Sequence, residues 1–346
     1  MNNSLQQKPE RSGTGAAIGL FFLAPLVAEF LLGNLPIKLL PALIMLAPMY
    51  GGGALLIRET VRRIGRGWPS ILLLSLTYGI VEEAAATQSL FNPDYLGMHM
   101  GLLKPAYILA FGMGGWWTIF VLNLHTVWSI ATPIALIEGM TPERSKAPWL
   151  GRVGLAVICV IFAAGAVAMT LMSYRHDRYM SSPAQFAGAA IACVTLVIAA
   201  LKLPRWEQGR EAGAVPSPWV VGALALAAGS AFLLIPNRWG WWAAAAIAGI
   251  DLVAGGAVWF WSRKAAWNQR HAVALASGAA LAYAWHAFIE TPIMASGVVT
   301  RIGNAIFAAG AVVVIWIAAN RTSRVAVEAQ ANKRREEIYP IIQLHG

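Results

Sequence analysis

Long apolar stretches alternate with short polar segments along the whole chain. A helix needs about 20 mostly apolar residues to cross ~30 Å of hydrocarbon, and the chain contains about ten stretches of that kind. The pattern therefore predicts an all-α, polytopic integral membrane protein with about ten transmembrane helices. The expected spans start near Gly15, Ile37, Pro69, Gly114, Val153, Pro183, Pro218, Gly240, His271 and Ile302.

Basic residues gather in every second connecting segment. Arg and Lys are dense from Arg58 to Arg66, Arg144 to Arg152, Lys202 to Arg210 and Arg263 to Arg270, whereas the connections between these are poorer in them. Under the positive-inside rule this alternation predicts that both termini lie in the cytoplasm. The net charge of +10 then reflects topology. Because no single patch gathers the basic residues, no nucleic-acid partner is expected.

The composition agrees with a chain that lies within a lipid bilayer. Hydrophobic residues make up 58% and charged residues 12% of it, whereas about a quarter of a soluble domain is charged. We predict a single transmembrane helical domain over residues 1–320, followed by a basic cytoplasmic tail over 321–346. The absence of a cleavage site after the first span and of sizeable loop domains indicates a bacterial cytoplasmic membrane. The sequence leaves the oligomeric state open.

Two adjacent glutamates, Glu82 and Glu83, lie within a predicted span. A charged side chain at the bilayer centre costs at least ~2.5 to 3.5 kcal/mol, so such residues usually have a functional reason. Adjacent residues point ~100° apart on a helix, and a helix that needs one carboxylate for structure rarely carries a second. Carboxylates in a low dielectric repel, which allows one of them to act as a general acid or base. The other ionisable residues within the spans are Glu29, His125, Asp251, His286 and Glu290.

Helical spacing collects the polar residues of three spans into stripes. Such stripes on otherwise apolar helices are expected to meet each other and not the lipid. The candidate catalytic residues are Glu82, Glu83, His125 and His286, and the roles of Glu29, Asp251 and Glu290 stay open. A possible divalent metal such as zinc would have Glu83, His125 and His286 as ligands and would generate hydroxide near neutral pH. The stripes are Ser75, Gly79, Glu82, Glu83 and Thr87; Thr118, His125, Ser129 and Thr132; and Tyr283, His286 and Glu290.

A glutamate pair followed by histidines on later helices resembles the CAAX-protease and bacteriocin-processing (Abi) family of intramembrane proteases. The pattern of that family is Glu-Glu-x-x-x-Arg, then Phe-x-x-x-His, then His-x-x-x-Asn or Asp. Glu82 and Glu83 match the pair, His125 matches the histidine of the second motif and His286 matches that of the third. The resemblance implies a membrane-embedded hydrolase in which one glutamate activates water with help from the histidines.

Three positions depart from the pattern of that family. Thr87 stands where the family has Arg, Val121 where it has Phe, and Glu290 where it has Asn or Asp. The missing cation leaves open what balances the charge of the glutamate pair.

Two other classes of function fit the same residues. In a proton-coupled membrane transporter the carboxylates and histidines would relay protons, which explains Glu29 and Asp251 better. A weak similarity in sequence between the first five spans and the last five also favours transport, because many transporters are built from two such halves. In a non-catalytic scaffold the polar stripes would only join helices. The substrate stays open among a membrane-embedded peptide, a lipid and a small solute, and the loop over residues 91–106 is either a lid or a simple turn.

Overall fold

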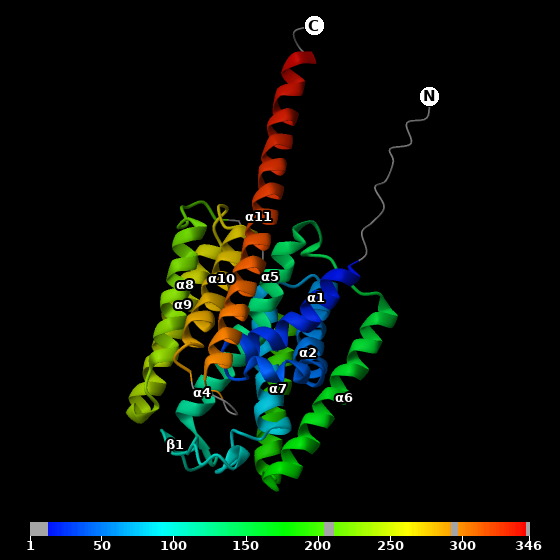
Figure 1. Cartoon of the computed structure of the whole chain (residues 1–346). Helices are drawn as coiled ribbons and strands as arrows, with labels where there is room; N and C mark the ends of the chain where they lie inside the picture. The colour runs from blue at the N-terminus through cyan, green and yellow to red at the C-terminus, as the bar shows by residue number, and fades with distance from the viewer. Residues whose placement is uncertain (1–12, 204–210, 291, 293–296, 344–346) are drawn as a thin grey trace.

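The computed structural model describes residues 13–203, 211–290, 292 and 297–343, with side chains up to residue 332. Helices form the whole of this part of the chain apart from its loops and one small hairpin (Figure 1). The hairpin pairs β1 (Tyr107–Ile108) with β2 (Met113–Gly114) in antiparallel register. The predicted all-α polytopic class is confirmed.

Each predicted span corresponds to a helix or to helical segments in direct succession. Among the described residues, seven helices are long and apolar enough to cross a membrane, and α8 is a shorter apolar helix. The helices are α1 (Thr14–Pro25) with η1 (Leu26–Leu31), η2 (Ile37–Ala42) with α2 (Leu43–Arg63), α3 (Trp68–Ile80) with η3 (Val81–Ala86), α4 (Gly115–Asn123) with η5 (Leu124–Ala131) and α5 (Thr132–Met140), α6 (Arg152–Asp177), α7 (Pro183–Lys202), α8 (Pro218–Leu234), α9 (Trp241–Ser262), α10 (Gln269–His286) and α11 (Val298–Gln343). Short 3-10 turns, η4 (Tyr95–Gly97), η6 (Pro142–Arg144) and η7 (Asn237–Trp239), lie in the connections.

Local sequence explains where several helices begin. Ser182 and Ser217 cap α7 and α8 by accepting a hydrogen bond from a backbone N–H of the first turn, and a proline follows each serine. Proline suits the first turn of a helix because its missing N–H has no partner there in any case.

The connections form two distinct ends of the bundle. At the basic end, Arg66 donates to the carbonyls of Leu201 and Leu203, which joins the α2–α3 connection to the end of α7. At the far end, the backbone N–H of Ser181 donates to Gln88 at 2.7 Å. The basic connections thus lie at one end of the bundle and the less basic ones at the other, as expected of helices that run in alternating directions. That the basic end faces the cytoplasm stays a prediction from the positive-inside rule.

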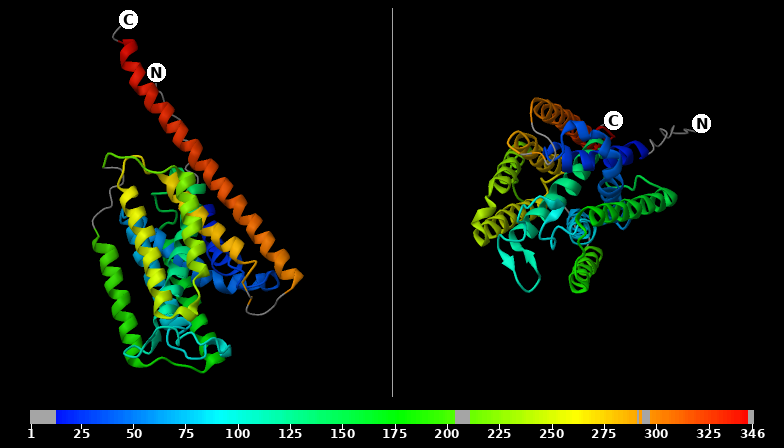
Figure 2. Two further views of the ribbon diagram at one scale, coloured as in Figure 1. Left: turned by 90° about the vertical axis from the view of Figure 1, so that its left-hand side faces the viewer. Right: turned by 60° about the horizontal axis from the view of Figure 1, so that its bottom comes forward.

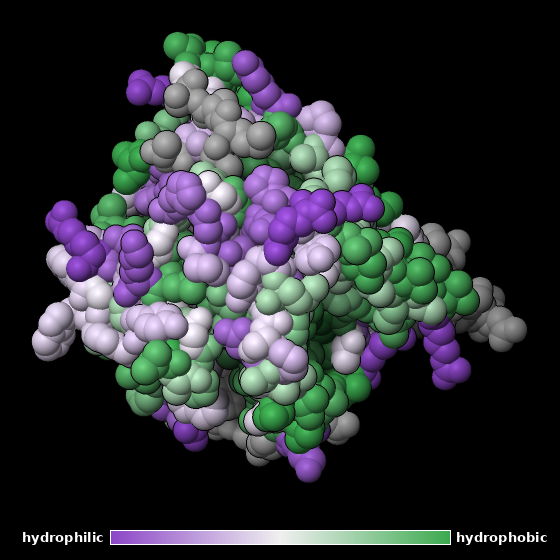
Figure 3. Space-filling model, turned by 90° about the horizontal axis from the view of Figure 1, so that it is seen from below, coloured by the Kyte–Doolittle hydropathy of each residue, from purple (hydrophilic) through white to green (hydrophobic). Residues whose placement is uncertain are grey.

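The outer helices differ from the central ones in what they expose. In α6, α7 and α9 only 11%, 6% and 11% of the most apolar window is buried, against 56% in the α4–α5 segment. Figures 1 and 2 show α6 and α7 on the outside of the bundle and α11 running well past it. Seen from the far end, hydrophilic residues cover much of the middle and left of the molecule, and a large hydrophobic area lies on the right (Figure 3). The sides therefore suit lipid.

Glycines allow the closest helix contacts. A Cβ at Gly51 would overlap the carbonyl of Phe21, and a Cβ at Gly278 would overlap the carbonyl of Gly222. These two positions bring α2 against α1 and α10 against α8 at backbone distance, as small residues commonly do in membranes.

Candidate functional site

Three helices change from α to π geometry where they carry their ionisable residues. Glu29 lies in η1, Glu82 and Glu83 lie in η3, and His125 lies in η5. A π turn adds a residue to the helical repeat and is frequent at functional sites, because it re-aims the side chains of that turn. The three distortions thus coincide with the polar residues that the sequence singled out.

Glu82, Glu83 and His125 form a compact buried group, which we call the carboxylate–imidazole group. One nitrogen or oxygen of each residue lies within 4.8 Å of the others, and all three side chains are buried. The imidazole lies between the carboxylates, with Nε2 2.7 Å from Oε1 of Glu83 and Nδ1 3.0 Å from Oε2 of Glu82. Two predicted stripes therefore meet, as expected.

Glu83 has partners on both of its carboxylate oxygens. Oε1 faces the imidazole of His125, and Oε2 accepts from the hydroxyls of Thr87 at 3.1 Å and of Ser89. Trp117 donates through Nε1 to Ser89 Oγ at 3.0 Å and fixes that hydroxyl. Thr87 stands where the resembled family has arginine, so neutral hydroxyls satisfy this carboxylate in place of a cation. Glu83 is therefore placed to hold His125 in position.

Glu82 is less satisfied. Its Oε2 is buried and has no partner in hydrogen-bonding geometry among the described residues, although Nδ1 of His125 lies close. That nitrogen is also 3.2 Å from the hydroxyl of Ser129. The hydroxyls of Tyr50 and Tyr78 lie beside the Glu82 carboxylate, and their rings are 6.1 and 6.0 Å from the imidazole. A lone pair on Glu82 is thus available in a buried place.

Glu29 forms a second acidic group next to the first. Its Oε1 accepts from the hydroxyl of Tyr50 at 2.6 Å, and its Oε2 accepts from Asn34 Nδ2 at 2.6 Å. Tyr50 is 4% exposed, whereas Glu29 is partly exposed. Tyr50 therefore lies between a buried and a partly exposed carboxylate.

His286 lies apart from the carboxylate–imidazole group. It ends α10, and its Nδ1 is 3.5 Å from Oε2 of Glu290. The next residue, Ala287, packs against Gly33, just after η1. Of the four candidate catalytic residues, the structure brings Glu82, Glu83 and His125 together and leaves His286 out. The predicted ligand set of Glu83, His125 and His286 is likewise not assembled.

The three assembled donors bear on the question of a metal. Three protein ligands are the usual number for catalytic zinc. As placed, however, each imidazole nitrogen faces a carboxylate, so the donors engage one another. A metal at this place would have to displace the imidazole from both carboxylates.

Asp251 also lies outside this group. Its Oδ2 accepts from Asn123 Nδ2 at 2.9 Å, which joins α9 to α4 within the membrane-spanning region. This hydrogen bond between two helices is the arrangement expected of polar residues that hold spans together.

Hydrogen bonds of Asn92 hold the loop that follows η3, the segment with the two glutamates of the carboxylate–imidazole group. The side chain of Asn92 accepts from the backbone N–H of Asp94, which makes the predicted turn, and donates to Asp177 at 2.7 Å. Burial, together with the negative charges of Glu83, Glu29 and Glu82, raises the pKa of the Tyr95 hydroxyl well above its usual value. The turn thus places Tyr95 within the electrostatic reach of the carboxylates.

A buried ion network, which the sequence pattern did not predict, lies at the basic end. Arg58 and Glu59 are 0% exposed, and they pair with each other at 2.6 Å. Glu138 lies 3.1 Å from Arg58 and 2.7 Å from Arg62. The positive-inside rule treats these arginines as loop charges, but α2 continues through them. The feature of the sequence that could have indicated this network is Glu59, a single acidic residue among several arginines.

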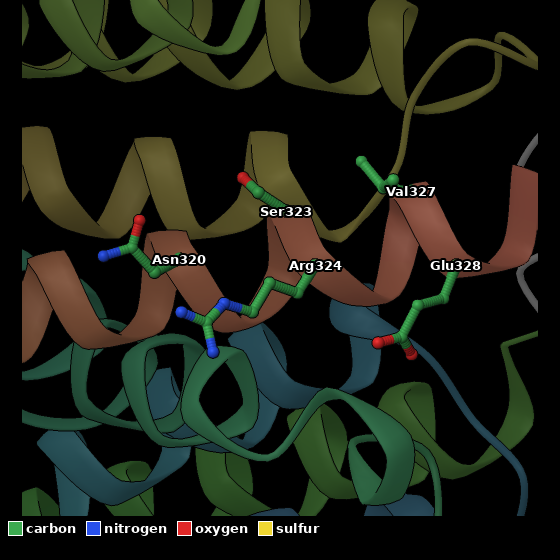
Figure 4. Close-up of a pocket in the computed structure, with 5 residues that line it drawn as sticks. All are labelled: Asn320, Ser323, Arg324, Val327 and Glu328. Carbon is green, nitrogen blue, oxygen red and sulfur yellow. The ribbon is translucent and has the colours of Figure 1, made fainter.

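Two hollows lie elsewhere on the molecule. A shallow one of about 310 Å³ is lined only by α11 residues, Asn320, Ser323, Arg324, Val327 and Glu328 (Figure 4). An apolar groove of about 610 Å³ runs between α8 and α9 and is lined by residues such as Leu224, Ala246 and Val253. Neither includes a residue of the carboxylate–imidazole group.

A comparison with protein families identifies the membership of this chain. A family model described as an uncharacterized membrane protein family matches residues 20–334. The chain belongs to that family. No curated protein and no solved structure matches it. Membrane insertion is therefore supported by the family as well as by the helices, and the chemistry has to be argued from the group itself.

Proposed function

We propose that this membrane protein is an intramembrane hydrolase of the glutamate-dependent, CAAX-protease-like type, with Glu82 as the general base. The observation that carries the proposal is the buried Glu82 Oε2, which has no partner in hydrogen-bonding geometry among the described residues and lies beside an imidazole held by Glu83. A base needs an unoccupied lone pair within reach of water. Burial in a low dielectric strengthens its interaction with the charge that develops during the reaction.

The roles follow from the contacts of each residue. The oxygen of a water molecule attacks the carbonyl carbon of the scissile bond while one of its protons passes to Oε2 of Glu82. The bond to the leaving amine then breaks, and Glu82 returns that proton to the amine. His125, oriented by Glu83 through Nε2 and by Ser129 at Nδ1, binds the water or the developing oxyanion. The substrate class is a membrane-embedded peptide, with a lipid or a small solute as alternatives.

The structure adds support at the position where the resemblance was weakest. The resembled family has arginine where this chain has Thr87, and here Thr87 and Ser89 both donate to Glu83. Hydrogen bonds to a charged acceptor stabilise it more than neutral pairs do. The glutamate pair can therefore be accommodated without the arginine.

The test is cleavage of a fluorogenic transmembrane peptide in proteoliposomes. Glu82→Gln keeps the shape of the side chain and removes the base, so we expect cleavage to fall by about 10²- to 10⁴-fold, the usual contribution of a positioned acid or base. Glu328→Gln, an exposed position on α11, is the matched control and should cleave like the wild type. Cleavage by Glu82→Gln at the wild-type rate would overturn the proposal.

A proton-coupled transporter is the second candidate, because Tyr50 joins Glu29 to the buried group. Transport requires ionisable groups that reach from one side of a membrane toward the other. Proteoliposomes loaded with a pH-sensitive dye distinguish the two candidates. Solute-dependent proton uptake that Glu82→Gln abolishes, in vesicles that cleave no peptide, would favour transport over hydrolysis.

A further inference from the structure

Glu29 and Tyr50 extend the carboxylate–imidazole group toward the end of α1. Glu29 lies two residues before the end of η1, where the chain turns back toward α2. Its carboxylate is held on both oxygens, by Tyr50 and by Asn34, at 2.6 Å each. Its partial exposure contrasts with Glu82, which is 1% exposed.

Tyr50 connects these two carboxylates. The hydroxyl that donates to Glu29 also lies beside the Glu82 carboxylate. A phenol hydroxyl can donate one hydrogen bond while it accepts another, which allows a proton to pass through it without the formation of a free ion. The ring is fixed by its neighbours, since it packs 6.1 Å from both Tyr78 and His125.

We infer that Tyr50 and Glu29 form the route by which protons enter and leave Glu82. When Glu82 is protonated before the reaction, its O–H donates to the Tyr50 oxygen as the Tyr50 hydroxyl proton moves to Glu29, which leaves Glu82 as the free base that the proposed reaction needs. Glu29 then releases a proton to water at its exposed side, and the chain resets by rotation of the hydroxyl. One proton enters and one leaves at each step. The inference rests on the proposed function, in which Glu82 is the base. Tyr50 and Glu29 touch no substrate and act only through Glu82.

The experiment follows protonation of the buried acid directly. Infrared difference spectra of the full chain in proteoliposomes, recorded after a pH jump, give the rate at which a carboxylic-acid band appears. The part of the band that is missing in Glu82→Gln belongs to Glu82. Tyr50→Phe keeps the ring but removes the relay oxygen, and Glu29→Gln keeps the acceptor but cannot take the proton. In both variants we expect the Glu82 band to appear about 10²-fold more slowly, the lower range for positioned proton transfer.

Matched controls separate a relay from a structural strut. Tyr174→Phe changes a tyrosine that is 39% exposed on α6, and it should leave the rate unchanged. Thermal unfolding of Tyr50→Phe and Glu29→Gln measures any loss of packing, which by itself would not slow the band in folded protein. Wild-type rates in both variants would overturn the relay. If instead Glu82→Gln cleaves peptide normally while the relay variants slow the band, the proposed function fails and the relay stands.

Discussion

Two buried charged clusters at different heights of the bundle are built in opposite ways. In the ion network at the basic end, the two oxygens of Glu138 accept from Arg58 and Arg62. Those of Glu59 accept from Arg58 and from the backbone N–H groups of Trp149 and Leu150. In the carboxylate–imidazole group no Lys or Arg of the described residues pairs with Glu82 or Glu83, and Glu82 Oε2 has no partner in hydrogen-bonding geometry.

The contrast separates charge used for structure from charge kept for chemistry. Buried ions stabilise a fold only when their desolvation is offset by good geometry and full hydrogen bonding, and both carboxylates of the ion network, Glu59 and Glu138, are hydrogen-bonded on both oxygens. A buried polar atom left unsatisfied in a native structure needs another explanation, and a functional role is a common one. The same α2 helix serves both clusters, through Arg58 and Glu59 at one end and Tyr50 farther along.

The largest effect on stability is expected in the ion network. Arg58→Ala leaves Glu59 and Glu138 short of a partner, and removal of one member of a buried ion pair costs about 3–5 kcal/mol. The free energy of unfolding in mixed micelles measures this. Glu82→Gln should change it by less than about 1 kcal/mol, because Glu82 has no arginine or lysine partner to lose and the amide is cheaper to bury. Equal losses in the two variants would remove the distinction between the clusters.

The next effect concerns how tightly the second cluster is packed. A Cβ at Gly53 would lie 2.5 Å from the ring of Tyr78, so Gly53→Ala must displace a buried aromatic ring. Overpacking of this kind costs about 1–3 kcal/mol. Gly249→Ala is the matched control, since nothing lies within 4 Å of its Cβ position, and it should be neutral or slightly stabilising. An unchanged unfolding free energy in Gly53→Ala would show that the ring of Tyr78, beside Glu82, is free to move.

The sequence predicted the spans and part of the group for a physical reason. A bilayer requires long apolar helices, so hydropathy finds them, and polar stripes avoid lipid, so Glu82, Glu83 and His125 were expected to meet. The π turns were out of reach, since a single sequence does not reveal an added residue in a helical turn. Tyr50 and Tyr78 were missed because aromatic residues in an apolar span fit an ordinary core.

The positions of His286 and Arg58 show where such reasoning stops. Polar stripes indicate that helices meet, but they do not say at which depth or with which partner, and His286 ended beside Glu290. The positive-inside rule counts arginines near the end of a helix as loop charges. It therefore gave no hint that Arg58 is fully buried against Trp149, at 3.5 Å from the ring centre.

His286 allows the resemblance and the geometry to be tested against each other. If the group in the structure is the working site, His125→Ala should lower peptide cleavage by about 10²-fold or more, whereas His286→Ala should lower it by less than about 10-fold. Both rates come from the proteoliposome assay. Equal losses in the two variants would mean that His286 also acts in the reaction, as the resemblance implies, and that Glu82, Glu83 and His125 alone are not the whole site.

The smallest effect is expected where a polar pair only joins two helices. Asp251 and Asn123 share one hydrogen bond, and such bonds between membrane helices contribute about 0.6 kcal/mol on average. A double-mutant cycle with Asp251→Leu and Asn123→Leu, read from unfolding free energies, should give a coupling near that value and leave peptide cleavage unchanged. A coupling of several kcal/mol would place this pair with the ion network as structure. A loss of solute-dependent proton uptake in Asp251→Leu would place it with the carboxylates, because a second membrane-embedded acid is what a transporter needs and a hydrolase does not.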